Sequence, residues 1–155
     1  MLRQRQNAGT IEATGVEISA RQTVRGGLDL TGAVSITDAR MDGGSAAPQL
    51  TGLRPAQAPI WSASAGIDWR ASDRLTLAAR ARYESKRFDD DLNSRVLGAA
   101  VTADVRADWR VNATASLWLA ADNLFDAEVD VSETGTGVEA FGPPRALSVG
   151  VRLAY

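Results

Sequence analysis

The sequence contains no cysteine and no histidine among its 155 residues. Without cysteine there is no disulfide framework, no thiolate metal site and no thiol nucleophile. Without histidine there is no Ser-His-Asp catalysis, no imidazole metal ligand and no ordinary general base near neutral pH. We therefore expect no enzymatic activity, no catalytic residue, no metal site and no cofactor.

Long apolar runs and clustered charges are also missing. Hydrophobic residues make up 45% of the chain, but no stretch of about 20 apolar residues occurs, so no membrane-spanning helix is expected. The 17 basic and 19 acidic residues nearly cancel and are interleaved, which argues against a nucleic-acid partner. No apolar stretch follows the charged start from Met1 to Asn7, so we expect no signal peptide in this sequence.

Alternation of apolar and polar residues is the main pattern present, and it places one set of side chains on each face of a β-strand. The clearest rows are Trp61, Ala63, Ala65, Ile67 and Trp69; Leu75, Leu77, Ala79, Ala81 and Tyr83; Leu97, Ala99, Val101, Ala103, Val105, Ala107 and Trp109; Ala113, Ala115, Leu117, Leu119 and Ala121; and Leu147, Val149, Val151, Leu153 and Tyr155. Two further strands precede Trp61, giving seven strands and no helix. In the first strand the apolar residues shift from odd-numbered to even-numbered positions, which predicts a β-bulge near Thr14-Gly15.

The connections between these strands alternate in length. Tight turns are expected at 25–27, 71–73 and 110–112, and longer polar or Gly/Pro-rich segments at 41–59, 88–93 and 124–144. Such sorting is typical of an up-and-down meander whose long loops emerge on one side, whereas a Greek-key sandwich does not require it. The predicted fold is all-β, an antiparallel up-and-down meander of about seven long strands that forms a segment of a transmembrane β-barrel.

The positions of the aromatic residues favour a membrane over a soluble sandwich. Trp69 and Trp109 immediately precede short turns, and Tyr155 ends the chain on the same apolar face. Trp61 lies eight residues before Trp69, which separates the two by about 20 Å along the membrane normal in a tilted strand. We predict that these four residues form aromatic girdles on either side of an apolar band.

The polar face holds most of the charges, and Trp118 falls on it as an exception. Asp104 and Asp108 are expected to pair with arginines rather than to act as an acid and a base. The acidic run Asp89-Asp90-Asp91 with Asn93 lacks the alternate-residue spacing of the common calcium loop. We interpret it as a solvated loop tip.

Several short motifs occur in a characteristic order. They are Asn7-Ala8-Gly9 followed by Gly15-Val16-Glu17, then Thr37-Asp38-Ala39-Arg40, Asn123-Leu124-Phe125-Asp126 and Gly142-Pro143-Pro144-Arg145. Together they resemble the TonB-dependent receptors, whose barrel has 22 strands around an N-terminal plug. In the last two motifs the matching residues are Asn123, Leu124, Phe125, Asp126, Gly142, Pro144 and Arg145.

The resemblance implies that residues 1–155 are the C-terminal portion of such a barrel, in the bacterial outer membrane, without the plug domain and signal peptide. The complete receptor would take up a scarce nutrient of the siderophore-iron, cobalamin or glycan class with energy from TonB, which it contacts through its N-terminal region. Expected partners are outer-membrane lipid, TonB, the small-molecule nutrient and the barrel-assembly machinery. The final row, Leu147, Val149, Val151, Leu153 and Tyr155, resembles the C-terminal signal read by that machinery.

Two other functions remain open from the sequence. A small autonomous outer-membrane barrel, acting as a pore or adhesin, needs an even number of at least eight strands. A secreted β-sandwich binding module needs a second sheet over the apolar face and would be soluble when expressed alone.

Overall fold

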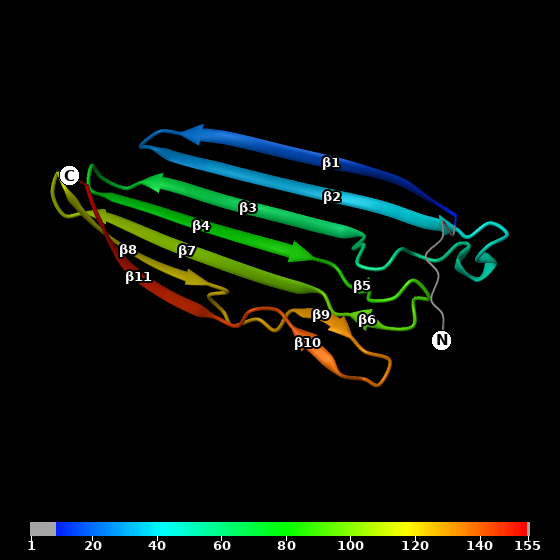
Figure 1. The fold of residues 1–155 in the computed structure, drawn as a ribbon. Helices are drawn as coiled ribbons and strands as arrows, with labels where there is room; N and C mark the ends of the chain where they lie inside the picture. Colours follow the sequence, from blue (N-terminus) through cyan, green and yellow to red (C-terminus); the bar gives the residue numbers. More distant parts are fainter. Residues whose placement is uncertain (1–8, 155) are drawn as a thin grey trace.

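The computed structural model describes residues 9–154, which form one curved antiparallel sheet with irregular segments gathered at one end (Figure 1). The sheet has the strand order β1-β2-β3-β4-β7-β8-β11, a meander without crossovers. Its strands are β1 (Thr10–Val24), β2 (Leu28–Asp42), β3 (Trp61–Arg70), β4 (Leu75–Glu84), β7 (Ala100–Arg110), β8 (Ala115–Asp122) and β11 (Ala146–Leu153). The predicted all-β meander of seven long strands is confirmed.

The long connections contain more structure than the sequence indicated. Two small ribbons pair β5 (Arg87–Phe88) with β6 (Val96–Leu97), and β9 (Asp130–Glu133) with β10 (Glu139–Phe141). One 3-10 turn, η1 (Pro48–Leu50), corrects the expectation of no helix at all. Among residues 9–154, no helix is long and apolar enough to cross a membrane.

Turn length separates the two ends of the sheet, as predicted. The three short turns lie at the end where the chain terminates, and the long connections lie at the opposite end (Figure 1). Polar side chains stabilise the short turns: the Ser72 hydroxyl accepts the Leu75 N–H at 3.1 Å, and the Asn112 carbonyl accepts the Ala115 N–H at 2.9 Å. Such side-chain to backbone bonds are the reason that Ser and Asn favour turns.

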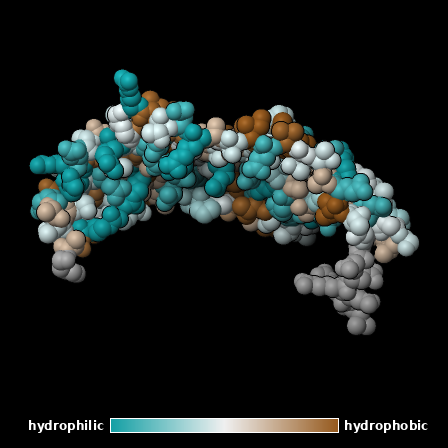
Figure 2. Space-filling view, turned by 90° about the horizontal axis from the view of Figure 1, so that it is seen from above, coloured by the Kyte–Doolittle hydropathy of each residue, from teal (hydrophilic) through white to brown (hydrophobic). Residues whose placement is uncertain are grey.

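Strand register aligns the apolar rows into one continuous face. A representative row crosses six strands through Leu30, Ile67, Ala79, Val105, Ala121 and Leu147. This face is not covered by a second layer in the described part of the chain, and Val149 on it is 77% exposed. Viewed from its β1 side, the molecule forms a curved arch (Figure 2).

The bulge predicted at Thr14-Gly15 is wrong. Strands β1 and β2 pair without a register shift from Thr10 opposite Asp42 to Val24 opposite Leu28. The apolar residues of β1 change face near the long loops, where β2 is covered on that other face although β1 itself stays exposed. There Ile11 and Ala13 lie opposite Met41 and Ala39, which are both buried, and the Met41 N–H is bonded to the Leu53 carbonyl of the connection after β2.

Leu97 also departs from the apolar row that was predicted to run from Leu97 to Trp109. The rows in 61–69, 75–83 and 101–109 do share the apolar face. Leu97 instead belongs to the β5–β6 ribbon and is only 2% exposed. The chain leaves the sheet before β7, where the Gly98 N–H is bonded to the Asp130 carboxylate at 2.9 Å.

Trp118 lies on the polar face, where it packs locally. It is opposite Asp108 on one side and Gly150 on the other, and the Arg106 guanidinium carbon lies 4.6 Å from the centre of its ring. A Cβ atom at Gly150 would approach the ring to 2.5 Å. The indole therefore lies directly over Gly150, and any residue other than glycine at this position would displace the indole.

We expect the change Gly150→Val to displace this indole and to lower the free energy of unfolding by about 1–3 kcal/mol, the usual cost of overpacking. Gly32→Val is the matched control, because its added Cβ would meet nothing closer than 3.8 Å. Urea midpoints of the folded, detergent-solubilised protein measure both. Equal midpoints for the two variants would contradict the packing described for Trp118.

Candidate functional site

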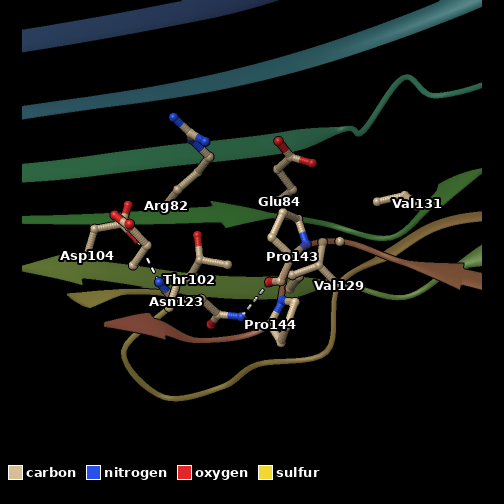
Figure 3. Close-up of a pocket in the computed structure, with 13 residues that line it drawn as sticks. Arg82, Glu84, Thr102, Asp104, Asn123, Val129, Val131, Pro143 and Pro144 are labelled. Carbon is tan, nitrogen blue, oxygen red and sulfur yellow. Dashed lines mark hydrogen bonds between the residues drawn. The ribbon is translucent and has the colours of Figure 1, made fainter. Parts of the chain in front are cut away.

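A cavity of about 520 Å³ lies on the polar face at the long-loop end of the sheet (Figure 3). Its floor consists of alternate residues of β4 and β7, because residues two apart on a strand share a face. These are Arg82, Glu84, Ala100, Thr102 and Asp104. The connection between β8 and β11 forms the wall, with Val129, Val131, Pro143 and Pro144 bringing apolar surface beside the charged floor.

Asn123 holds the base of this wall. It is 7% exposed and adopts a positive φ of 49°, a conformation that Asn tolerates better than most residues. Its side-chain carbonyl accepts the Ala127 N–H at 2.9 Å, and its amide group donates to the carbonyls of Ala127 at 2.9 Å and Pro143 at 3.2 Å. One side chain thus joins the end of β8 to the approach to β11.

Asp126 makes a second link between the same segments. Its carboxylate accepts the Arg145 N–H at 2.8 Å, and the Gly142 N–H is bonded to the Val129 carbonyl at 2.8 Å. The two sequence motifs at 123–126 and 142–145 are therefore brought together in space. Leu124 contributes to the apolar face beside Leu147, while Phe125 is 75% exposed and takes no part in these links.

The expected pairing of Asp104 with an arginine is wrong, whereas that of Asp108 is correct. Asp108 bonds Arg106 at 2.6 Å, but the Asp104 carboxylate accepts the Asn123 N–H at 2.9 Å. Arg80, which lies opposite Asp104 in register, donates to both carboxylate oxygens of Asp68 at 2.7 and 2.8 Å. Asp104 therefore shapes the cavity instead of neutralising an interior charge.

The interpretation of the acidic run at 89–91 as a solvated loop tip is only partly correct, because Asp91 is exposed but all three carboxylates accept hydrogen bonds. Asp91 accepts the Ala56 N–H at 3.0 Å, and Asn93 exchanges two hydrogen bonds with the backbone of Arg54. Burial alone would raise the pKa of the Asp90 carboxyl, but hydrogen bonds from Arg95 and Ser94 outweigh it and lower that pKa below its usual range. The run therefore anchors one loop to another.

Two important residues were missed by the sequence analysis. Gln57 and Arg87 lie in different loops, and each bonds to residues distant in sequence. Nothing in their local sequence marks them, because neither belongs to an apolar row or to a motif. Within residues 9–154 there is no group of three side chains suited to hold a metal ion.

The aromatic residues occupy both ends of the exposed apolar face. Trp69 and Trp109 lie near the short turns, and Trp61 lies at the other end of β3. Tyr83, which was not included among the predicted girdle residues, lies on the neighbouring strand opposite Ala63, two residues along from Trp61. In β11 the side chains of Leu147, Val149, Val151 and Leu153 are all exposed, and Tyr155 lies outside the described residues.

Comparisons with known proteins agree on one family. The family described as "TonB dependent receptor-like, beta-barrel" matches residues 3–124. The chain is 34% identical over 128 residues to the "Ferrichrome outer membrane transporter/phage receptor" of Escherichia coli (strain K12), an alignment covering 77% of this chain and 17% of that protein.

Solved structures show the same fold at lower identity. The siderophore receptor PiuA from Acinetobacter baumannii superposes with a TM-score of 0.82 at 19% identity, covering 96% of this chain and 22% of that one. The ferric yersiniabactin uptake receptor FyuA from Yersinia pestis superposes with a TM-score of 0.84 at 20% identity, covering 95% of this chain and 24% of that one. The chain thus spans 17% of the matched curated relative and less than a quarter of these two structures.

Proposed function

Because this chain belongs to the TonB-dependent receptor β-barrel family and is therefore a protein of the bacterial outer membrane, we propose that it forms the C-terminal wall of a receptor for a siderophore-iron complex. The complete receptor would import this complex with energy delivered by TonB. The names of the relatives, which refer to ferrichrome, yersiniabactin and siderophores, support this ligand class. In this function the segment is a transport component and not an enzyme.

The observation on which the proposal mainly depends is the division of the sheet into two unlike faces. One face is a continuous apolar surface that is exposed in the described chain, and the other has charged residues and a cavity beneath the long loops. A barrel wall needs lipid-facing and lumen-facing residues in alternation. We propose that lipid covers the first face, with Trp61, Trp69, Trp109 and Tyr155 at its borders, and that the cavity opens toward the ligand.

Topology supports a role as part of a larger wall. Seven strands in an up-and-down sheet make β1 and β11 run in the same direction, so antiparallel closure requires an odd number of additional strands. The match to the receptor family favours the receptor over a small autonomous barrel. The β-sandwich is disfavoured because no second sheet covers the apolar face among residues 9–154. We further propose that β11, with its apolar row and Tyr155, is the strand recognised by the barrel-assembly machinery.

Uptake of radioactive iron tests the proposed function. Bacteria producing the complete receptor would be supplied with ferric complexes of hydroxamate, catecholate and carboxylate siderophores. We expect accumulation of at least one complex, and its loss in a TonB-deficient strain or when residues 10–153 are deleted from the receptor. Accumulation that continues without TonB, or no receptor-dependent uptake of any complex, would overturn the proposal.

The isolated chain is expected to aggregate in water or to require detergent. Its sheet has two unpaired edges, at β1 and β11, and an exposed apolar face, both of which promote association. Light scattering of the refolded chain, with and without detergent, measures this. A monodisperse monomer without detergent would instead favour a soluble binding module.

A further inference from the structure

The three long connections, at 43–60, 85–99 and 123–145, meet at the side chain of Gln57. Its carbonyl oxygen accepts a hydrogen bond from Arg87 Nε at 2.9 Å. Its amide nitrogen lies 2.9 Å from Asp89 Oδ1 and 3.2 Å from the Val131 carbonyl oxygen, and donates to both. The backbone N–H of Gln57 also donates to the Phe88 carbonyl at 2.7 Å. A single residue of the first loop therefore bonds both of the others.

Arg87 extends this contact to the sheet. Its side chain is 8% exposed, Nη2 donates to the Asp130 carbonyl of β9 at 2.9 Å, and Nη1 lies 3.5 Å from a carboxylate oxygen of Glu84 in β4. Both Glu84 and Val131 line the cavity. The buried guanidinium thus connects the cavity floor, the second loop and the third loop.

The backbone at Gln57 indicates that this contact determines the local conformation. Its φ is 57°, which residues other than glycine rarely adopt and which persists when surrounding contacts over-determine it. Four hydrogen bonds to two other loops provide such contacts. Gln57 itself is exposed, so water competes for its side-chain bonds, and the buried member of the network is Arg87. Removing a bond from a buried guanidinium is costly, and Arg87 Nη1 already has no hydrogen-bond partner among residues 9–154.

We propose that Gln57 and Arg87, which we call the loop joint, make the three long connections a single conformational unit and set the position of the cavity wall at Val131. Coupling between sites is reciprocal. A displacement of β9 by anything that fills the cavity is therefore transmitted to the connections at 43–60 and 85–99. This inference goes beyond the uptake function and does not depend on the identity of the ligand.

Hydrogen exchange of the complete receptor in detergent, followed by mass spectrometry, tests the loop joint. The variant Gln57→Asn tolerates the positive φ but is one methylene shorter, so it cannot reach both Arg87 and Val131. We expect amide exchange to accelerate on the order of tenfold or more in all three connections, because local opening sets these rates. The strands of the sheet should keep their protection.

Asp91→Ala is the matched control, because it removes a bond to the Ala56 N–H and leaves the third connection untouched. Its acceleration should be confined to 43–60 and 85–99. Arg87→Lys preserves the charge near Glu84 but offers one ammonium in place of a guanidinium, so it should loosen 123–145 as Gln57→Asn does. If Gln57→Asn accelerated exchange in 43–60 alone, the proposal would be overturned.

A distance measurement keeps the test independent of whether the joint variants fold. These 155 residues contain no cysteine, so, once any cysteine elsewhere in the complete receptor is replaced, Thr51→Cys and Thr136→Cys allow spin labels to be attached to the first and third connections. We expect one narrow distance distribution, which Gln57→Asn broadens. A broad distribution in the absence of any joint variant would show that the connections move independently.

Discussion

Replacing Asn123 by alanine is expected to lower the free energy of unfolding by about 2–5 kcal/mol. Three side-chain hydrogen bonds to Ala127 and Pro143 are lost, and buried partner groups without a replacement cost about 1–3 kcal/mol. Alanine must also adopt a positive φ, which adds about 1–2 kcal/mol for a residue with a Cβ atom. The midpoint of urea unfolding, measured on the detergent-solubilised receptor, should therefore move to a lower urea concentration.

Three further variants separate the causes of this loss. Asn123→Gly relieves the strain but not the missing bonds, so it should recover only part of the stability. Asn123→Asp keeps the acceptor for the Ala127 N–H and loses both donated bonds. Phe125→Ala, in the same motif but at an exposed position, should have little effect. Equal stability of Asn123→Ala and Phe125→Ala would contradict the role assigned to Asn123.

The sheet was predictable from sequence because its determinants are local. A strand alternates with period two, so each row identifies its own face without knowledge of its neighbours. Turn length then orders the strands, and Ser72 and Asn112 stabilise turns through bonds that span only three residues. The false bulge at Thr14-Gly15 has the same origin. A parity change can mean an inserted residue or a change in the covered face, and the sequence does not distinguish them.

The cavity and the loop joint were less predictable because their contacts join distant residues. Gln57 and Val131 are 74 positions apart, and Gln57 and Arg87 are 30 apart. Asp104 illustrates a related difficulty. Its charge suggested an arginine partner, but Arg80 is already bound by Asp68, and only the register reveals this competition. The motifs contain Asn123 and Arg145, but nothing in them indicates the hydrogen bonds that join their two segments.

The second large effect is expected for a charge placed on the apolar face at mid-depth. Ala65 lies halfway between Trp61 and Trp69, and its row continues through Ala81 to Ala103. In a membrane barrel, a lysine on the lipid-facing side costs about 2–4 kcal/mol near the bilayer midplane, and this cost falls to about 0–1 kcal/mol near the interfaces. We therefore expect Ala103→Lys to reduce the free energy of unfolding in lipid bilayers by about 2–4 kcal/mol.

Two neighbouring positions make this prediction specific to the lipid-facing side. Val101 lies on the same face, level with Ala63 and Tyr83 and one register step from Ala103 toward the long-loop end of the sheet, so Val101→Lys should cost less than Ala103→Lys. Thr102 lies between them in sequence and lines the cavity, so Thr102→Lys should cost least, because its ammonium can remain hydrated near Glu84. Reversible unfolding in bilayers measures all three. An equal loss of unfolding free energy at 101, 102 and 103 would mean that the apolar face does not meet lipid. Lipid on one face of the strand should make lysine more costly at 101 and 103, which point to that face, than at 102, and more costly at 103, which lies deeper, than at 101.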